Sequence, residues 1–412
     1  MEGRKTRKFA DSEQNGHVAL PTNSPFNLDM SPTKLGSFHP SRRLYLFFLI
    51  TSAIIITTWL IRNGSEFDLS NMAFVDERYG VVIDSEEYWQ QGKFVNHGLD
   101  LIPTFDAHHS VLKDIPTDKL GYNAVVLYLI SFNRLRDVIL SLSFLHKNVP
   151  MQPWPIVLFH TDDMDDSVAR DSFMLHLYDE LGTDEKAKQF MQRIEFVRLD
   201  NWSLPPGFPT DKNVVKPSFS DSWPGYHIMC GFFASQIFDH PRLQDVTYYL
   251  RLDTDSYIYK PVCYDPIDLL HTKKKVYGFR SPSDDPPYVT EGMWELTDRY
   301  SRQHPEIRER LNQNRWVWPE GLQGNYPTYY NNFEVVKLAE FRRPEVKRWL
   351  EEIMKDPYRI YKHRWGDAPI RFTTVNMFFD VEKDVENYCA VPYWHNGPAR
   401  HVCSCEDQLS GR

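Results

Sequence analysis

Two aspartates one residue apart are the first residues in this sequence whose type and spacing could do chemistry. Asp253 and Asp255 follow the apolar run Tyr248–Leu252. If that strand continues through them, both carboxylates point to the same side. Hard oxygen ligands of this kind suit Mn²⁺ or Mg²⁺, which in turn would hold a diphosphate. The alternative is an ordinary turn, because Asp-Thr-Asp-Ser is also good turn chemistry.

Three further residues are candidates for a functional site. Glu334 lies among aromatic and amide residues in the segment 329–335, where a carboxylate could stand beside a sugar or could simply be a surface acid on a strand. Asp367 is followed by Ala-Pro, so it could be a functional acid or the cap of a helix. His395 could complete a metal site as a neutral imidazole, or it could be a structural or exposed histidine.

The segments that must position these residues have the pattern of an α/β domain. Buried-strand runs at 123–130 and 155–160 flank a helical pattern at 135–145. This strand–helix–strand unit implies a parallel sheet. Further elements are predicted as a strand at 193–199, a helix at 226–240 and a strand at 246–252. The fold class is therefore α/β with an open, mostly parallel sheet, and ligands of such sheets bind beyond the carboxyl ends of the strands.

Composition and charge exclude several classes of protein. The 412 residues are 42% hydrophobic and 25% charged, which rules out collagen, a wholly disordered chain and a multi-span membrane protein. The net charge of -9 argues against a nucleic-acid partner.

One apolar run predicts a membrane anchor. Leu44–Ile61 has no charged residue and, as a helix, would span roughly 27 Å. Lys and Arg are concentrated in residues 1–43, which we expect to be the cytoplasmic tail of a type II protein. The expected organisation is a tail at 1–43, a transmembrane helix at 44–61, a stem at 62–121 and a lumenal catalytic domain at 122–412.

The cysteines and a glycosylation motif agree with a lumenal domain. All five cysteines follow the predicted anchor, where disulfides persist. Because five is odd, at least one is free or pairs between chains. Cys403 and Cys405 are too close to bridge each other comfortably, so one of them is expected to reach back to Cys230, Cys263 or Cys389. Asn201-Trp-Ser is an N-glycosylation acceptor, whereas the same motif at Asn63 lies against the predicted membrane and is expected to be unused.

An Asp-x-Asp that ends a buried strand, in a lumenal α/β domain behind a type II anchor, is the layout of a glycosyltransferase that uses a nucleotide sugar. The more specific motifs are Asn332-Phe-Glu334 and Arg364-Trp-Gly-Asp-Ala-Pro369, supported by Tyr226…Met229-Cys230…Phe232, Arg251-Leu-Asp-Thr-Asp255, Val276-Tyr-Gly-Phe279 and Tyr393-x-His-x-x-Pro398. In this order the chain resembles the fungal-type Golgi α-1,2-mannosyltransferases of glycosyltransferase family 15, the glycolipid 2-α-mannosyltransferase group, and it resembles them as a divergent member.

The resemblance implies a GT-A-like fold, GDP-mannose as the donor, Mn²⁺ as the cofactor, a mannosylated glycan as the acceptor, and transfer with retention in the Golgi. It implies Glu334 as the nucleophile or front-face stabiliser and Asp367 as an acceptor-side acid. It further implies two groups of ligands: Tyr226, Arg251, Asp253 and Asp255 for the donor, and Asp253, Asp255 and His395 for the metal.

The chain departs from the family pattern at three places. The family's Glu-Pro-Asp is Asp253-Thr-Asp255 here, and the arginine of its Met-Cys-Arg-Phe is Gly231. Its usual Arg-Asn after the first strand is replaced by Ser131-Phe-Asn133-Arg134. Three other functions are considered: transfer from another nucleotide sugar, a lumenal glycosidase, which also uses paired carboxylates, and a non-catalytic glycan-binding relative.

Overall fold

The computed structural model of the chain describes residues 74–76, 81–83, 119–395, 397–399 and 403–410. The predicted tail, the transmembrane span 44–61 and most of the predicted stem lie outside these residues. Among the residues described, no helix is both long enough and apolar enough to cross a membrane.

A seven-stranded mixed sheet organises the domain, in the order β12-β8-β11-β6-β3-β4-β5. Its strands are β3 (Ala124–Leu129), β4 (Ile156–His160), β5 (Ile194–Arg198), β6 (Tyr248–Leu252), β8 (Tyr277–Phe279), β11 (Phe333–Lys337) and β12 (Val385–Asn387). Strands β3, β4, β5 and β6 run parallel, and β11 pairs antiparallel with both β6 and β8. The prediction of an α/β fold with a mostly parallel sheet is confirmed.

Three smaller antiparallel pairs complete the strands. They are β1 (Phe74–Asp76) with β2 (Val81–Ile83), β9 (Pro282–Asp285) with β10 (Tyr326–Tyr329), and β7 (Tyr257–Ile258) with β13 (Tyr393–Trp394). The last pair matters for function because it brings the segment before His395 alongside the chain that leaves β6.

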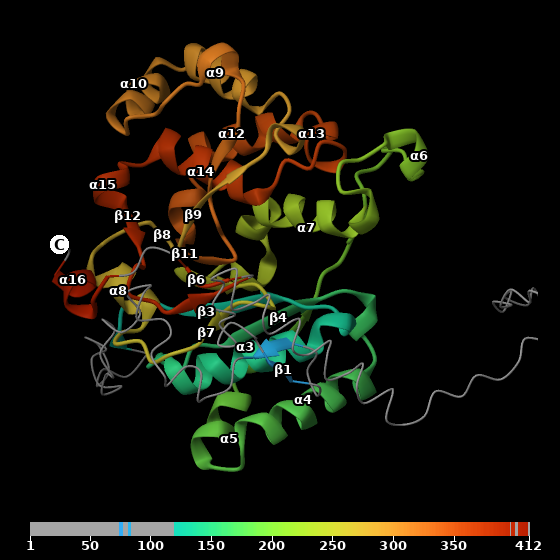
Figure 1. Cartoon of the computed structure of the whole chain (residues 1–412), viewed down its shortest axis with the longest axis vertical. Coiled ribbons are helices and arrows are strands. Elements are labelled where there is room, and N and C mark those ends of the chain that lie inside the picture. The colour runs from blue at the N-terminus through green and yellow to red at the C-terminus, as the bar shows by residue number, and fades with distance from the viewer. Residues whose placement is uncertain (1–73, 77–80, 84–118, 396, 400–402, 411–412) are drawn as a thin grey trace, which may run out of the picture. The chain divides into compact units, whose positions relative to one another are not determined.

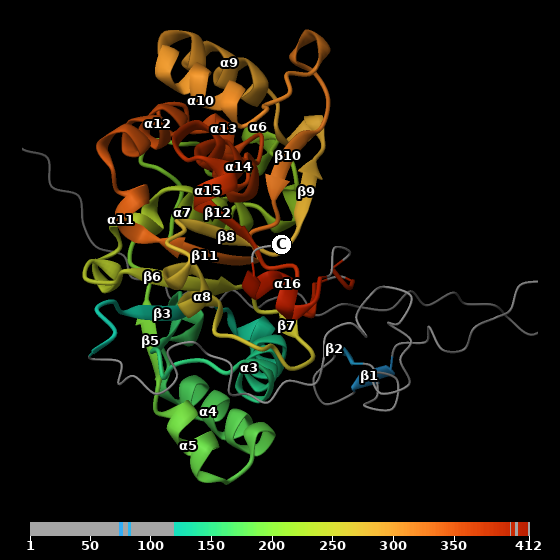
Figure 2. The same cartoon turned by 90° about the vertical axis from the view of Figure 1, so that its left-hand side faces the viewer.

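Helices cover both faces of the sheet (Figures 1 and 2). One face packs on α3 (Leu135–Asn148), α4 (Ser167–Leu181), α5 (Glu185–Met191) and α8 (Pro266–Thr272). The other packs on α7 (Gly225–Ala234), α12 (Pro344–Met354) and α14 (Asp367–Phe378), with α9 (Met293–Gln303) and α10 (Pro305–Gln313) beyond them. Shorter helices are α6 (Lys212–Val215), α11 (Leu338–Phe341), α13 (Tyr358–Tyr361), α15 (Val381–Asp384) and α16 (Cys405–Ser410).

Alternation along β3 explains this two-layered core. Val125 and Leu127 point to the α7 and α14 side, whereas Ala124, Val126 and Tyr128 point to the α3 side. All of them are buried, which is why the strand reads as a continuous apolar run.

Most predicted elements are observed within a few residues of their expected ends. The predicted helix 226–240 is shorter, because α7 ends at Ala234 and a 3₁₀ turn, η8 (Gln236–Asp239), follows. Ser235 between them has non-helical backbone angles (φ −140°, ψ −51°).

Two disulfides tie the C-terminal segment to the domain. Cys263 pairs with Cys405 and Cys389 pairs with Cys403, while Cys230 is free and buried. Both Cys403 and Cys405 therefore reach back, where only one was expected to, and the odd cysteine is a free thiol in the core. The thiol lies in apolar surroundings, and burial raises its pKa.

Candidate active site

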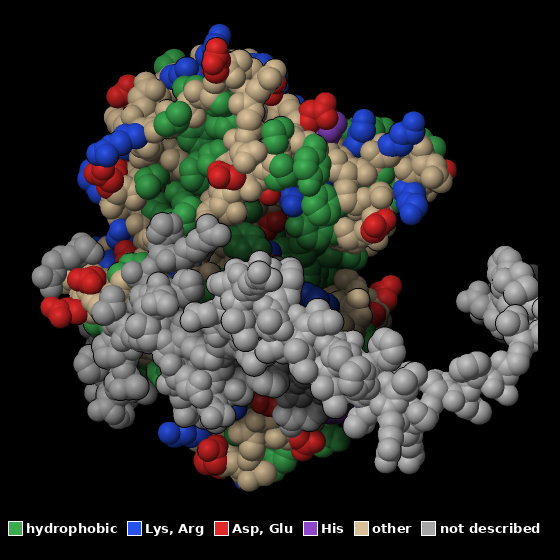
Figure 3. Space-filling model, viewed as in Figure 1, with side chains coloured by type: hydrophobic (Ala, Val, Ile, Leu, Met, Phe, Trp, Pro, Cys, Tyr) green, Lys and Arg blue, Asp and Glu red, His purple; other side chains and the backbone are tan. Residues whose placement is uncertain are grey.

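A pocket of about 800 Å³ opens where three parallel strands end. The pocket is lined at the carboxyl end of β3 by Leu129, Ser131 and Arg134, and at the end of β4 by Thr161. At the end of β6 it is lined by Arg251, Asp253, Thr254 and Asp255. Side chains of α7 contribute another wall. The hollow is visible on the face of the molecule in Figure 3, with charged side chains inside it. This is the place predicted for a ligand of an open α/β sheet.

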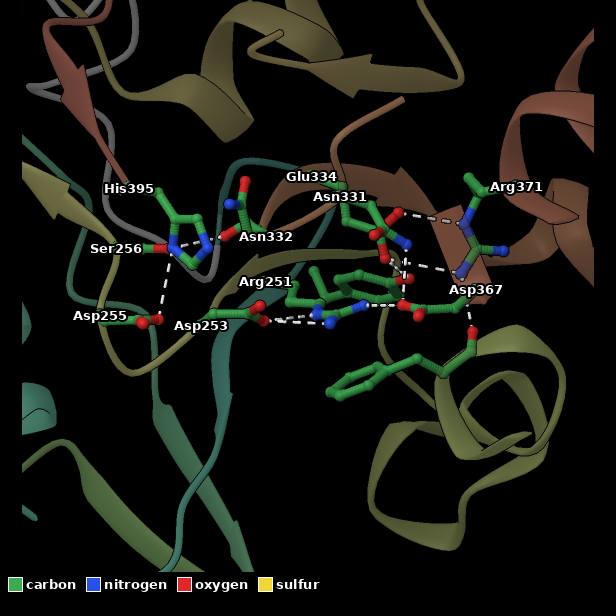
Figure 4. A network of polar contacts seen from close by, with 12 residues as sticks. Arg251, Asp253, Asp255, Ser256, Asn331, Asn332, Glu334, Asp367, Arg371 and His395 are labelled. Carbon is green, nitrogen blue, oxygen red and sulfur yellow. Dashed lines mark hydrogen bonds and ion pairs between the residues drawn. The ribbon is translucent and has the colours of Figure 1, made fainter. Parts of the chain in front are cut away.

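The Asp-Thr-Asp segment forms a turn after β6. The strand ends at Leu252, and the Ser256 amide donates to the Asp253 carbonyl at 3.1 Å to close the turn. The prediction that a continuing strand aims both carboxylates the same way is therefore wrong. Both acids line the pocket, but Asp253 turns toward Arg251 while Asp255 turns toward His395 (Figure 4).

Asp255 is held between two cationic or potentially cationic side chains. Its Oδ2 accepts from Arg134 Nη2 at 2.7 Å, and its Oδ1 lies 3.3 Å from His395 Nδ1. Burial disfavours the charge of His395, but the hydrogen bond and charge of Asp255 outweigh burial and raise the pKa of the imidazole. Burial likewise opposes the charge of Asp255, and the contact with His395 nonetheless lowers the pKa of its carboxyl.

The three predicted metal ligands are not assembled as a set. Nowhere in the described part of the chain do three His, Cys, Asp or Glu side chains come close enough together to hold a metal ion. The reason is local, since Asp253 Oδ1 accepts from Arg251 Nε and Nη2 at 3.1 and 3.0 Å. Asp255 and His395 remain as an adjacent carboxylate–imidazole pair at the pocket wall, a donor set that suits Mn²⁺.

Arg251 links Asp253 to Asp367. Its side chain is 2% exposed, and its guanidinium contacts Asp253, lies 3.5 Å from the Phe233 ring centroid, and donates to Asp367 Oδ2. Asp367 is the first residue of α14 and lines the pocket, where Asn331 also donates to it at 2.9 Å. The N-cap position of α14 is Gly366, so Asp367 is not the cap residue and the capping alternative does not account for it.

Glu334 lies beneath the pocket. It sits on β11 opposite Arg251, is completely buried, and is not among the pocket-lining residues. Tyr249 Oη donates to its Oε1 at 2.8 Å, and Arg371 Nε of α14 donates to its Oε2 at 3.0 Å (Figure 4). The alternative of a surface acid is therefore wrong, and the role of Glu334 beside a sugar stays a prediction.

Tyr226 lies where the motif comparison expects it, on α7 and in the pocket wall. Cys230 is the largest influence on its phenol, and together with burial it raises the pKa of Tyr226 well above the ordinary range.

Several pocket residues were not predicted from the sequence. Asn332 is 3% exposed and lines the pocket, and neither polar atom of its amide has a partner in the part of the chain described here. Arg364 and Asp285 also line the pocket and form an ion pair at 2.9 Å. The signal for Asn332 and Arg364 was present, since both belong to the two most specific motifs, which were interpreted only through their acids.

The C-terminal half of the chain is similar to a known family of enzymes. Residues 210–410 match the family model described as glycolipid 2-alpha-mannosyltransferase. The probable mannosyltransferase KTR4 of Saccharomyces cerevisiae is 28% identical over 225 residues, which is 50% of this chain and 47% of that protein. The alpha-1,2 mannosyltransferase KTR1 of the same yeast is 26% identical over 171 residues, 41% of this chain and 43% of that protein. Over residues 210–410, just under half of its length, the chain is similar to this family, and its identity to the two yeast proteins is below 30%.

The chain spans about half the length of the curated relatives it matches. Solved structures support the same fold. The mannosyltransferase Ktr4p of S. cerevisiae in complex with GDP is 20% identical with a TM-score of 0.59, over 78% of this chain and 85% of that one. Core-mannan synthase A of Aspergillus fumigatus, in a Mn/GDP form, is 20% identical with a TM-score of 0.58, over 74% and 85%.

The structure explains one departure from the family pattern. A Cβ at Gly231 would lie 2.8 Å from the Tyr361 hydroxyl, so an arginine does not fit there unless Tyr361 moves. Arg364 supplies a guanidinium to the pocket instead, 5.5 Å from the ring centroid of Tyr226.

Proposed function

We propose that this chain is a retaining α-1,2-mannosyltransferase that transfers mannose from GDP-mannose to the 2-hydroxyl of a mannose-containing glycan. We further propose the type II Golgi organisation expected from the sequence, with a tail at 1–43, an anchor at 44–61, a stem at 62–121 and a lumenal catalytic domain at 122–412. One observation carries the proposal. In a chain similar to this family, a single pocket at the strand ends contains the Asp255–His395 pair, Arg134 and the Arg251–Asp367 pair.

The arrangement suits a nucleotide sugar. The carboxyl ends of β3 and β4 provide the usual place for a nucleotide in an open α/β sheet. Arg134 and Arg251 place positive charge in the same pocket, where a diphosphate requires it. The amide of Asn332 lines the same pocket and, with no partner among the described residues, offers both a donor and an acceptor to a sugar hydroxyl.

Mn²⁺ is the proposed cofactor, and Asp255 and His395 would hold it. When bound, the ion would neutralise the developing charge of the leaving GDP. The motif also predicts Asp253 as a metal ligand. Asp253 would bind the ion only if its carboxylate broke its hydrogen bonds with Arg251. Arg134, which donates to Asp255 Oδ2, would oppose a cation bound to the same carboxylate, because the two positive charges repel each other.

The acids are assigned according to their distance from the pocket. Asp367 lines it and is proposed as the acid on the acceptor side. Charge at the anomeric carbon is stabilised by a nearby carboxylate, as in glycoside hydrolysis. Glu334 is one layer deeper, so we propose that it acts through Arg371 and Tyr249 as a positioning residue.

The test is transfer of mannose from GDP-mannose to methyl α-mannoside by the full chain, with Mn²⁺ and with EDTA. Metal-dependent transfer with retained configuration supports donor, cofactor and class together. Activity that survives EDTA would overturn the metal assignment. Three other results would replace the proposal with an alternative. Transfer from another nucleotide sugar only would mean a different donor, and hydrolysis without GDP release would mean a glycosidase. Glycan binding without turnover would mean a non-catalytic relative.

A further inference from the structure

Three aromatic rings lead from the pocket to the protein surface. Tyr226 on α7 forms part of the pocket wall, and the ring of Phe219 lies next to it with 6.2 Å between centroids and 25° between planes. The ring of Tyr288 follows, 6.4 Å from Phe219 and at 15° to it. We call Tyr226, Phe219 and Tyr288 the aromatic strip.

The outer two rings face solvent. Phe219 is 46% exposed and Tyr288 is 61% exposed, although an isolated ring of this size would be expected to pack inward. Isolated exposed apolar side chains need no explanation, but adjoining ones that continue from a pocket mark a binding surface. In Figure 3, hydrophobic side chains gather on the rim above the hollow.

The backbone holds the strip in place. Phe219 has φ +56°, a left-handed conformation that a bulky residue rarely adopts. It precedes the 3₁₀ turn η7 (Ser220–Ser222), and Ser218 Oγ donates to the Tyr288 carbonyl at 3.2 Å in η10 (Pro287–Val289). Strain of this kind persists where the surroundings fix it, and it is concentrated at functional sites.

The surroundings of the strip are polar in a way that suits a sugar. The Arg364 guanidinium lies 4.8 Å from the centroid of Phe219, and it pairs with Asp285. A pyranose has an apolar face of C–H groups edged by hydroxyls, so it needs a flat ring beneath it and charged or amide groups at its side. A purely apolar peptide or lipid would remove water from this ion pair without offering it a hydrogen bond in return.

We propose that the aromatic strip is an acceptor subsite that binds sugar units of an oligomannoside beyond the unit being extended. This inference rests on the proposed function and adds to it that the preferred acceptor is an oligosaccharide. Tyr226 lies at the reacting end, and Phe219 and Tyr288 support the units farther out.

The test compares two acceptors and a set of ring variants in the full chain. The probes are methyl α-mannoside and α-1,2-mannotriose, with GDP-mannose as donor. We expect the wild type to have a kcat/KM about tenfold higher for mannotriose. Phe219→Ala and Tyr288→Leu each reduce that advantage by about three- to fivefold, while kcat/KM for methyl α-mannoside and the affinity for GDP stay within twofold.

Matched variants separate ring stacking from folding. Tyr288→Phe keeps the flat ring and is expected to keep the preference for mannotriose. Leu175→Ala removes a side chain that is 60% exposed on α4, far from the strip in the sequence, and is expected to change neither acceptor. Melting temperatures check that each variant is folded.

Three outcomes would overturn the inference. The first is equal use of both acceptors by the wild type. The second is a loss of GDP affinity in Phe219→Ala, which would mean that the ring stacks on the base. The third is a preference for a mannosylated peptide that the ring variants lose and with which mannotriose does not compete. If the wild type transfers to no acceptor, the proposed function fails. Saturation-transfer NMR of mannotriose binding to the wild type and to Phe219→Ala then tests the strip separately.

Discussion

Replacing Glu334 with Gln is expected to destabilise the domain before it affects chemistry directly. Glu334 and Arg371 are both fully buried and form an ion pair at 3.0 Å between β11 and α14. Burial disfavours the charge of Arg371, but Glu334 outweighs it and raises the pKa of the guanidinium above its ordinary range. The variant therefore keeps a buried cation and removes its counter-charge.

The size of the effect follows from what remains around Arg371. Removing one partner of a buried ion pair costs about 3–5 kcal/mol. We expect about 3 kcal/mol, because Arg371 still donates to the Phe233 carbonyl at 2.9 Å and lies 4.6 Å from the Phe238 ring centroid. With an unfolding entropy of roughly 2.1 cal/mol/K per residue over about 290 residues, this corresponds to a fall in melting temperature of about 5 °C.

The assay measures the unfolding midpoint and kcat per folded molecule for the same preparations. The double variant Glu334→Gln with Arg371→Met removes both charges and is expected to recover part of the lost stability. If Glu334→Gln melts like the wild type but loses transfer by about a thousandfold or more, then the argument from burial is refuted and Glu334 reaches the sugar.

Three further predictions follow from other contacts. Arg134→Gln frees Asp255, so Mn²⁺ binding without nucleotide, followed by electron paramagnetic resonance, should tighten by about three- to tenfold, whereas GDP binding should weaken. His227 is buried without a side-chain partner in the described part of the chain, and burial lowers its pKa to about 4. The unfolded state therefore binds the proton first as the pH falls from 6.5 toward 4, so stability falls across that window and falls less in His227→Phe, as denaturant titrations at each pH would show. Replacing Cys263 and Cys405 with Ser opens a loop of 142 residues and should cost up to about 5 kcal/mol in unfolding free energy.

Each of these has a contradicting result, and the first two have a control variant. Arg198→Gln breaks an exposed pair with Asp162 and should leave Mn²⁺ binding unchanged, and equal metal affinity in Arg134→Gln would show that Arg134 does not compete for Asp255. For His227, His176→Gln on the exposed side of α4 serves as the comparison. A His227→Phe profile parallel to that of the wild type would mean that this imidazole does not set the slope. A Cys263/Cys405 variant as stable as the wild type would remove the bridge as a source of stability.

The sequence was sufficient for whatever depends on neighbours along the chain. The apolar runs at β3, β4 and β6 and the helical spacing at α3 predicted the parallel part of the sheet, because side-chain periodicity reports local burial. It also placed a ligand site after β6, since the carboxyl ends of parallel strands share one edge. The specific motifs around Glu334 and Asp367 indicated the family.

The tertiary structure decided which of these residues meet. Arg134 reaches Asp255 across 121 residues of sequence, and Arg251 reaches Asp367 across 116. The turn after Leu252 separates the two aspartates that the strand pattern had placed together, and the β6–β11 register places Glu334 under α14 instead of in the pocket. The partners of Cys403 and Cys405, and the neighbouring rings of Phe219 and Tyr288, were equally hidden. Local pattern fixes the type of each element, whereas register and packing between distant elements determine the direction of each side chain and the charges that surround it.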